Sequence, residues 1–136
     1  MRVLLGATAG TYKNGETIGD ILAYNHAGTE TIPPRPVLRI AAEKAINDNK
    51  AIIQTYLKNV VQYSIHSPKD LPKLEAELLR KLGVASISEA KRIIDSGDQL
   101  RENAPATVRK KGFNHPLYVD GTMKEHLAYQ IDNEDA

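Results

Sequence analysis

The segment that most restricts the fold of this chain is rich in proline. Ile32-Pro33-Pro34-Arg35-Pro36 places three prolines within four positions. A proline ring fixes φ and removes the backbone N–H, and it also pushes the preceding residue toward an extended conformation. We therefore expect a rigid extended strap here. Pro36 can serve as the first residue of a following helix, because that position does not need its N–H.

Apolar periodicity predicts further elements on both sides of the strap. An uninterrupted apolar run within residues 1–7 is typical of a buried strand, and residues 17–27 have the spacing of a short helix. Gly28 is suited to end that helix, since glycine readily adopts a positive φ. The longest predicted helix spans residues 37–61, and roughly half of its surface would face a core or a neighbouring subunit.

Two shorter helices are expected next, and together they would form a helical hairpin. The first begins at Ser67 or Asp70 and ends at Gly83. The second begins at Ser86, where Glu89 completes a capping box. The buried face of the first helix would consist of Leu71, Leu74, Leu78, Leu79 and Leu82, and that of the second of Ala90, Ile93 and Ile94.

The C-terminal part of the chain changes character. A basic loop occupies residues 109–112, and apolar residues alternate with polar ones from Leu127 to Ile131, which suits a strand. Residues 132–136 form an acidic tail. We therefore expect one α+β domain over residues 1–131. Its small antiparallel sheet would be built from both chain ends and packed with one long helix and the helical hairpin.

Composition excludes several classes of function. The chain of 136 residues suffices for one domain, and it has no cysteine, so disulfides, thiolate metal sites and cysteine nucleophiles are excluded. A net charge of +1 disfavours a role in holding duplex DNA by its phosphates. The apolar stretch at residues 2–7 is too short for a signal sequence or a membrane span. We therefore expect a protein that stays in the cytoplasm until a partner takes it up.

The candidate chemical motifs do not combine into a catalytic site. The glycines of residues 6–10 follow a strand, but no helix starts inside that run, as dinucleotide binding would require. A nucleotide-binding enzyme is the alternative that this segment leaves open. The histidines lack metal-ligand spacing, and the scattered carboxylates offer no acid–base pair. We therefore expect no enzymatic activity, no cofactor and no metal.

A basic run is the basis of an alternative from another functional class. Arg109, Lys110 and Lys111, with Phe113 close by, can contact nucleic-acid phosphates or an acidic partner surface. A solvated loop explains the same residues. A small nucleic-acid-associated protein that uses residues 109–113 would bind DNA or RNA in a salt-sensitive manner.

Several segments, taken in order, resemble a family of phage proteins. They are Val3-Leu4-Leu5-Gly6, residues 18–29, Ile32-Pro33-Pro34-Arg35-Pro36-Val37-Leu38-Arg39, residues 103–112 and Val119-Asp120-Gly121-Thr122. This pattern is similar to that of the small virion-morphogenesis proteins of tailed phages, which are called neck, tail-completion or minor tail proteins. The resemblance covers almost the whole chain, and the Pro-Arg-Pro strap and the Lys-Gly loop are its most specific parts.

The resemblance implies a structural virion protein at the head–tail junction or the head-proximal end of the tail. Its partners would be further copies of itself in a six-fold or twelve-fold ring, other neck and tail proteins, and duplex DNA in transit through the ring. Closed rings use heterologous interfaces, in which one patch meets a different patch on the neighbour. We hypothesise that stiff segments with mixed apolar and cationic side chains make these contacts. The residues concerned are Ile32, Pro33, Pro34, Arg35, Pro36, Leu38, Arg39, Arg109, Lys110, Lys111 and Phe113.

Overall fold

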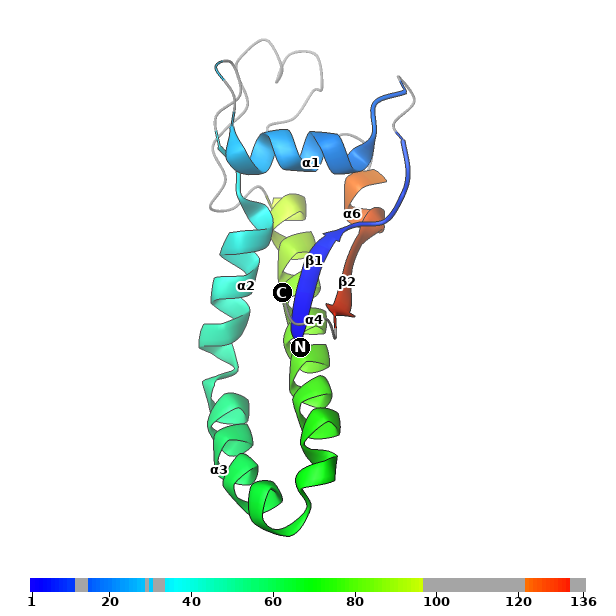
Figure 1. Cartoon of the computed structure of the whole chain (residues 1–136). Coiled ribbons are helices and arrows are strands. Elements are labelled where there is room, and N and C mark those ends of the chain that lie inside the picture. The colour runs from blue at the N-terminus through cyan, green and yellow to red at the C-terminus, as the bar shows by residue number, and fades with distance from the viewer. Residues whose placement is uncertain (12–14, 29, 31–33, 97–121, 133–136) are drawn as a thin grey trace.

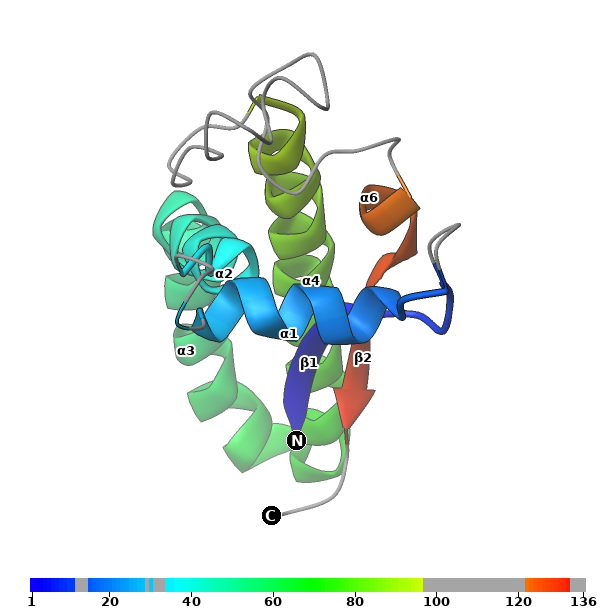
Figure 2. The same cartoon turned by 90° about the horizontal axis from the view of Figure 1, so that it is seen from above.

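A computed structural model describes residues 1–11, 15–28, 30, 34–96 and 122–132. In chain order its elements are β1 (Arg2–Ala7), α1 (Ile18–Ala27), α2 (Val37–Asp48), α3 (Lys50–His66), the single 3-10 turn η1 (Pro68–Asp70), α4 (Leu71–Ser96), α6 (Thr122–His126) and β2 (Leu127–Asp132). Helices α2 and α4 lie side by side, the two strands lie against α4, and α1 crosses the end of this arrangement (Figure 1, Figure 2). The predicted basic loop and the acidic tail beyond Asp132 lie outside the described residues.

The two ends of the chain meet in a two-stranded antiparallel sheet, which confirms the predicted α+β class. The register places Arg2 opposite Asp132, and Arg2 Nε donates a hydrogen bond of 2.9 Å to the Asp132 carboxylate. At the other end of the strands, the Thr8 N–H donates to the His126 carbonyl at 2.7 Å. The pairing therefore continues one residue past the end of β1.

The hydrophobic core lies where α4 meets α1, α2 and the sheet. On α2, Val37, Ala41 and Ala45 are spaced four residues apart, so they share one face of the helix, and all three are buried. The small alanine side chains allow α2 to lie close along α4, which is its main contact. The buried apolar cluster consists of Ile18, Leu22, Val37, Ala41, Ile87, Ala90, Ile93, Ile94, Met123 and Leu127.

The predicted continuous helix over residues 37–61 is in fact two helices. The helix is interrupted at Asn49 and resumes as α3, which continues to His66. The Asn49 side-chain amide donates a hydrogen bond of 2.7 Å to the Ala45 carbonyl. A side chain that binds a nearby carbonyl competes with the regular helical pairing, so the interruption is local to this residue.

The predicted pair of short helices is also corrected, because α4 runs without a break through Gly83 and Ser86. Gly83 is buried inside the helix against the ring of Tyr129. Ser86 does not cap a new helix, since it is buried and its hydroxyl donates to the Leu82 carbonyl at 2.7 Å. A helical hairpin is present earlier in the chain than predicted, where η1 joins α3 to α4 (Figure 1).

Candidate functional site

The structure describes about half of the contact residues that the sequence suggested. Ile32, Pro33 and the basic residues 109–111 with Phe113 lie outside the described residues. Pro34, Arg35, Pro36, Leu38 and Arg39 are described, and they lead into α2 or lie in its first turn. Of these residues, Leu38 packs partly buried against the core, whereas Arg39 is exposed.

Arg35 has an intramolecular role, which revises its expected role as a surface contact. Its side chain is 8% exposed, and Nη1 donates a hydrogen bond of 3.2 Å to the side-chain carbonyl of Asn25. The Arg35 backbone N–H donates to the Asn25 main-chain carbonyl. Asn25 is itself buried, and its amide donates to the Ile21 carbonyl at 2.9 Å. These bonds join the start of α2 to the last turns of α1.

The close approach of Pro34 to the end of α1 also explains why residue 28 is a glycine. Gly28 ends α1 with φ +79°, and a Cβ at this position would lie 2.9 Å from Pro34 Cγ. Both the backbone conformation and the space therefore favour glycine. Among the described contact residues, this leaves Arg39 as the cation that is accessible to a partner.

A row of exposed apolar side chains lies instead on the arm, by which we mean α3, η1 and the first half of α4. Helix α3 has no buried residue, although it is 17 residues long. Leu57, Val61 and Ile65 are 59%, 58% and 69% exposed, and their four-residue spacing places them along one side of the helix. We call these three residues the outer stripe. Sequence reasoning missed it because the predicted helix ended at residue 61, before Ile65, and its apolar face was not divided between a core and a neighbouring subunit.

A shallow groove separates α3 from α4 on another side of the arm. It has a volume of about 350 Å³ and is lined by both helices, with Ile52, Tyr56 and Leu78 among its apolar residues. Burial, followed by the charge of Glu75, raises the pKa of the Tyr56 phenol. The two helices of the arm are thus less closely packed than α2 and α4 are.

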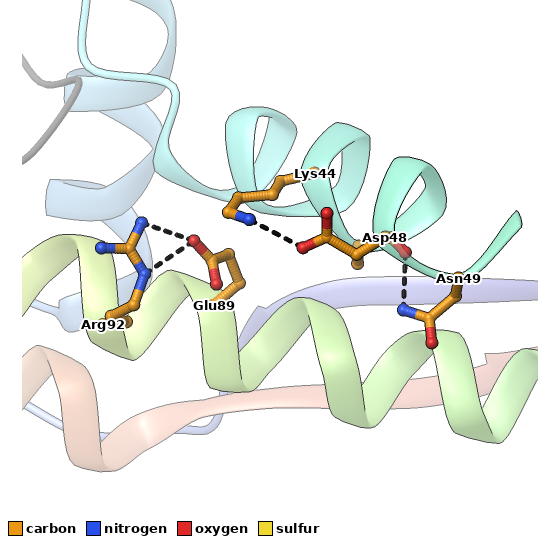
Figure 3. Close-up of polar contacts among 6 residues, drawn as sticks. Lys44, Asp48, Asn49, Glu89 and Arg92 are labelled. Atoms are coloured by element: carbon orange, nitrogen blue, oxygen red, sulfur yellow. Dashed lines mark hydrogen bonds and ion pairs between the residues drawn. The ribbon is translucent and has the colours of Figure 1, made fainter.

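Polar contacts surround the point where the arm meets the core (Figure 3). On α2, Lys44 Nζ lies 2.7 Å from the Asp48 carboxylate, and on α4, Arg92 lies 2.6 Å from Glu89. The hydrogen bond to Asp48 and its negative charge raise the pKa of Lys44, with a smaller contribution from Glu89 across the helix interface. Each pair lies within one helix, and Lys44, Asp48 and Arg92 are substantially exposed to water, so each pair contributes little to the stability of the fold.

The described residues offer little for the alternative chemistries. They contain no group of three His, Asp or Glu side chains that could hold a metal ion, and none of their helices is long and apolar enough to cross a membrane. Gly10, in the glycine-containing loop after β1, has a packing role, since a Cβ there would lie 2.7 Å from the His126 ring and 2.9 Å from Ile18. No protein-family model, curated protein or solved structure matches this chain.

Proposed function

We propose that this chain is a structural subunit of a tailed-phage particle. It assembles with further copies into a ring at the head–tail junction or the head-proximal end of the tail, through which DNA passes. The observation that carries the proposal is the outer stripe on an arm that extends from the core (Figure 1). The order of motifs in the sequence, which resembles that of neck and tail-completion proteins, supplies the identity of the particle.

The outer stripe has the properties of an assembly contact. Exposed apolar side chains are ordinary when scattered, but a continuous row on a protruding element marks an interaction surface. Complete burial of the three partly exposed side chains would contribute roughly 3–5 kcal/mol, at 1.5–3 kcal/mol for each full side chain. That is no more than the lower estimates of the cost of association, about 4–15 kcal/mol. A single contact of this size is therefore weak in dilute solution, whereas a closed ring on a preformed particle makes several such contacts at once.

The charge of the chain agrees with the passage of DNA better than with its capture. The net charge is +1, and α3 carries Lys50 and Lys58 but no acidic residue. Two lysines attract the phosphates of DNA only weakly, whereas tight non-specific DNA binding needs many phosphate contacts. The alternative function, nucleic-acid binding by residues 109–113, concerns residues outside the described part of the chain. Salt-sensitive binding of DNA by the purified protein would favour this alternative.

The first experiment is to locate the protein in purified phage particles whose genome encodes it. Labelling combined with particle imaging gives its position, and quantitative mass spectrometry gives its copy number. We expect a small fixed number, six or twelve, at the head–tail junction or the adjoining end of the tail. Absence from the particles would overturn the proposal.

A pair of neighbouring substitutions on α3 tests the role of the outer stripe. Val61→Glu places a charge in the stripe, and Gln62→Glu introduces the same side chain about 100° around the helix. Both positions are exposed, so the free energy of unfolding should change by no more than about 0.5 kcal/mol in either variant. We expect Val61→Glu to lower the copy number in particles at least about tenfold, the equivalent of 1.4 kcal/mol. Gln62→Glu should match the unmodified protein, and an equal loss in both variants would exclude a specific role for the stripe.

A further inference from the structure

The outer edge of β2 has backbone groups that the intramolecular sheet does not use. In an antiparallel pair, residues alternate between those that exchange hydrogen bonds with the neighbouring strand and those that turn their N–H and C=O groups away from it. Thr8 and His126 are joined by a hydrogen bond and stand opposite each other in the register. Two residues further along, Ala128 therefore faces β1. By the same alternation, Tyr129 and Ile131 turn their backbone N–H and C=O groups toward the outer edge, whereas Leu127 directly follows α6 and is buried.

No other strand pairs with this edge in the part of the chain that the structure describes. An open strand edge is a template for a further strand, and natural proteins commonly protect it with a charge, a proline or a bulge. The sequence of β2, Leu-Ala-Tyr-Gln-Ile-Asp, has a charge only at its last residue and no proline. Nothing within the strand itself therefore prevents the addition of another strand.

Beside this edge lies an apolar groove between β2 and α4. Its volume is about 380 Å³, and it is lined by Val84, Ile87, Ser88, Lys91, Leu127, Ala128 and Tyr129. Val84 is 52% exposed, although it lies in the middle of α4 next to the buried Gly83. The tight contact between Gly83 and Tyr129 fixes the spacing of helix and strand, so the groove is held open by packed atoms on both sides.

One side chain gives the groove a charge preference. Lys91 lines it, and no ion pair or hydrogen bond involves its ammonium group within the described residues. A neighbouring cation, Lys124, is already engaged, because its Nζ lies 2.9 Å from the Asp95 carboxylate. A carboxylate that entered the groove would therefore meet Lys91 in a partly dehydrated site, where a charge-assisted hydrogen bond is strong.

We propose that an extended segment of a partner protein adds to β2 as a third strand and places alternate side chains in this groove. Backbone hydrogen bonds to Tyr129 and Ile131 supply affinity, and the groove supplies specificity. Because strand side chains alternate between the two faces, every second residue of the segment points toward α4. The segment that fits has apolar residues at those positions and an aspartate or glutamate at the one nearest Lys91. This inference goes beyond the proposed function, because it rests on the edge, the groove and Lys91 alone.

The test uses a blocked synthetic peptide, Thr-Val-Thr-Val-Thr-Glu-Thr, and the intact protein labelled with ¹⁵N. We expect the peptide to shift the amide resonances of Tyr129 and Ile131 and to slow their hydrogen exchange. A peptide with Lys in place of Glu should bind at least about threefold more weakly, given the energy of one partly exposed charge pair. In the Lys91→Glu variant this preference should reverse. Lys73 lies about 27 Å away along α4, so the Lys73→Glu variant should keep the preference for the peptide with Glu.

Three results would overturn the proposal. Slow exchange of the Tyr129 and Ile131 amides in the free protein would mean that the chain itself already covers the edge. Concentration-dependent shifts of the same amides without peptide would assign the edge to a second copy. A peptide preference that Lys91→Glu leaves unchanged would exclude the groove as the source of specificity. The position of the protein in phage particles affects none of these measurements, so this inference and the proposed function fail separately.

Discussion

Replacing Arg35 with glutamate is expected to destabilise the protein by about 3–5 kcal/mol, the range found when one partner of a buried charged contact is removed. Arg35 is buried, and its guanidinium donates to the side chain of Asn25. Glutamate offers only acceptors at neutral pH, so the Asn25 carbonyl would lose its donor and face a buried negative charge. Since domains of this kind have a total stability of about 5–15 kcal/mol, a substantial part of it would be lost.

Chemical denaturation by urea, followed by circular dichroism, measures this effect. Arg39→Glu is the matched control, because Arg39 lies four residues further on and is exposed. We expect its free energy of unfolding to remain within about 0.5 kcal/mol of the unmodified protein. Arg35→Lys keeps the charge but loses the planar fork of donors, and it should fall between the two. Equal stability of Arg35→Glu and Arg39→Glu would show that the contact with Asn25 contributes nothing to the fold.

The contrast between these two arginines illustrates what the sequence could predict about the site. The proline pattern identified a rigid segment, and the structure places Arg35 and Pro36 directly before α2. The proline pattern did not distinguish an arginine that points inward from one that points outward, because both belong to the same Pro-Arg-Pro-Val-Leu-Arg run. Burial of Arg35 depends on Asn25, which lies ten residues earlier on a different helix. A contact between distant segments of this kind leaves no periodic signal in the sequence.

The pairing of the chain ends was more predictable. A continuous apolar run at the N-terminus and an alternating pattern near the C-terminus are both signals of strands, and they correctly indicated β1 and β2. The boundaries of the helices were less predictable from the sequence. Asn49 interrupts a helical pattern that is otherwise continuous, whereas Gly83 and Ser86 look like a helix end and a helix start but occur within α4. Local signals are weak where tertiary packing gives the residue another role.

The role of Gly83 leads to a second prediction with a large expected effect. A Cβ at this position would lie 2.8 Å from both Cγ and Cδ2 of Tyr129. Tyr129 Cβ, which the backbone of β2 fixes, would also lie only 3.2 Å away, so relief requires a different χ1 rotamer of the ring together with a shift of the strand. We expect Gly83→Val to destabilise the protein by about 2–3 kcal/mol, as overpacking of a core commonly does. This cost exceeds the few tenths of a kcal/mol that valine gains over glycine in helix propensity.

The same substitution at Gly19 separates packing from helix propensity. Gly19 lies in α1, and a Cβ there would have no atom within 4 Å. Gly19→Val should therefore leave the stability unchanged or raise it by a few tenths of a kcal/mol. Combining Gly83→Val with Tyr129→Ala should cost less than the sum of the two single changes, because the clash disappears with the ring. Strict additivity of the two changes in urea denaturation would mean that α4 and β2 are not held apart by this contact, and the groove beside Val84 would lose its fixed wall.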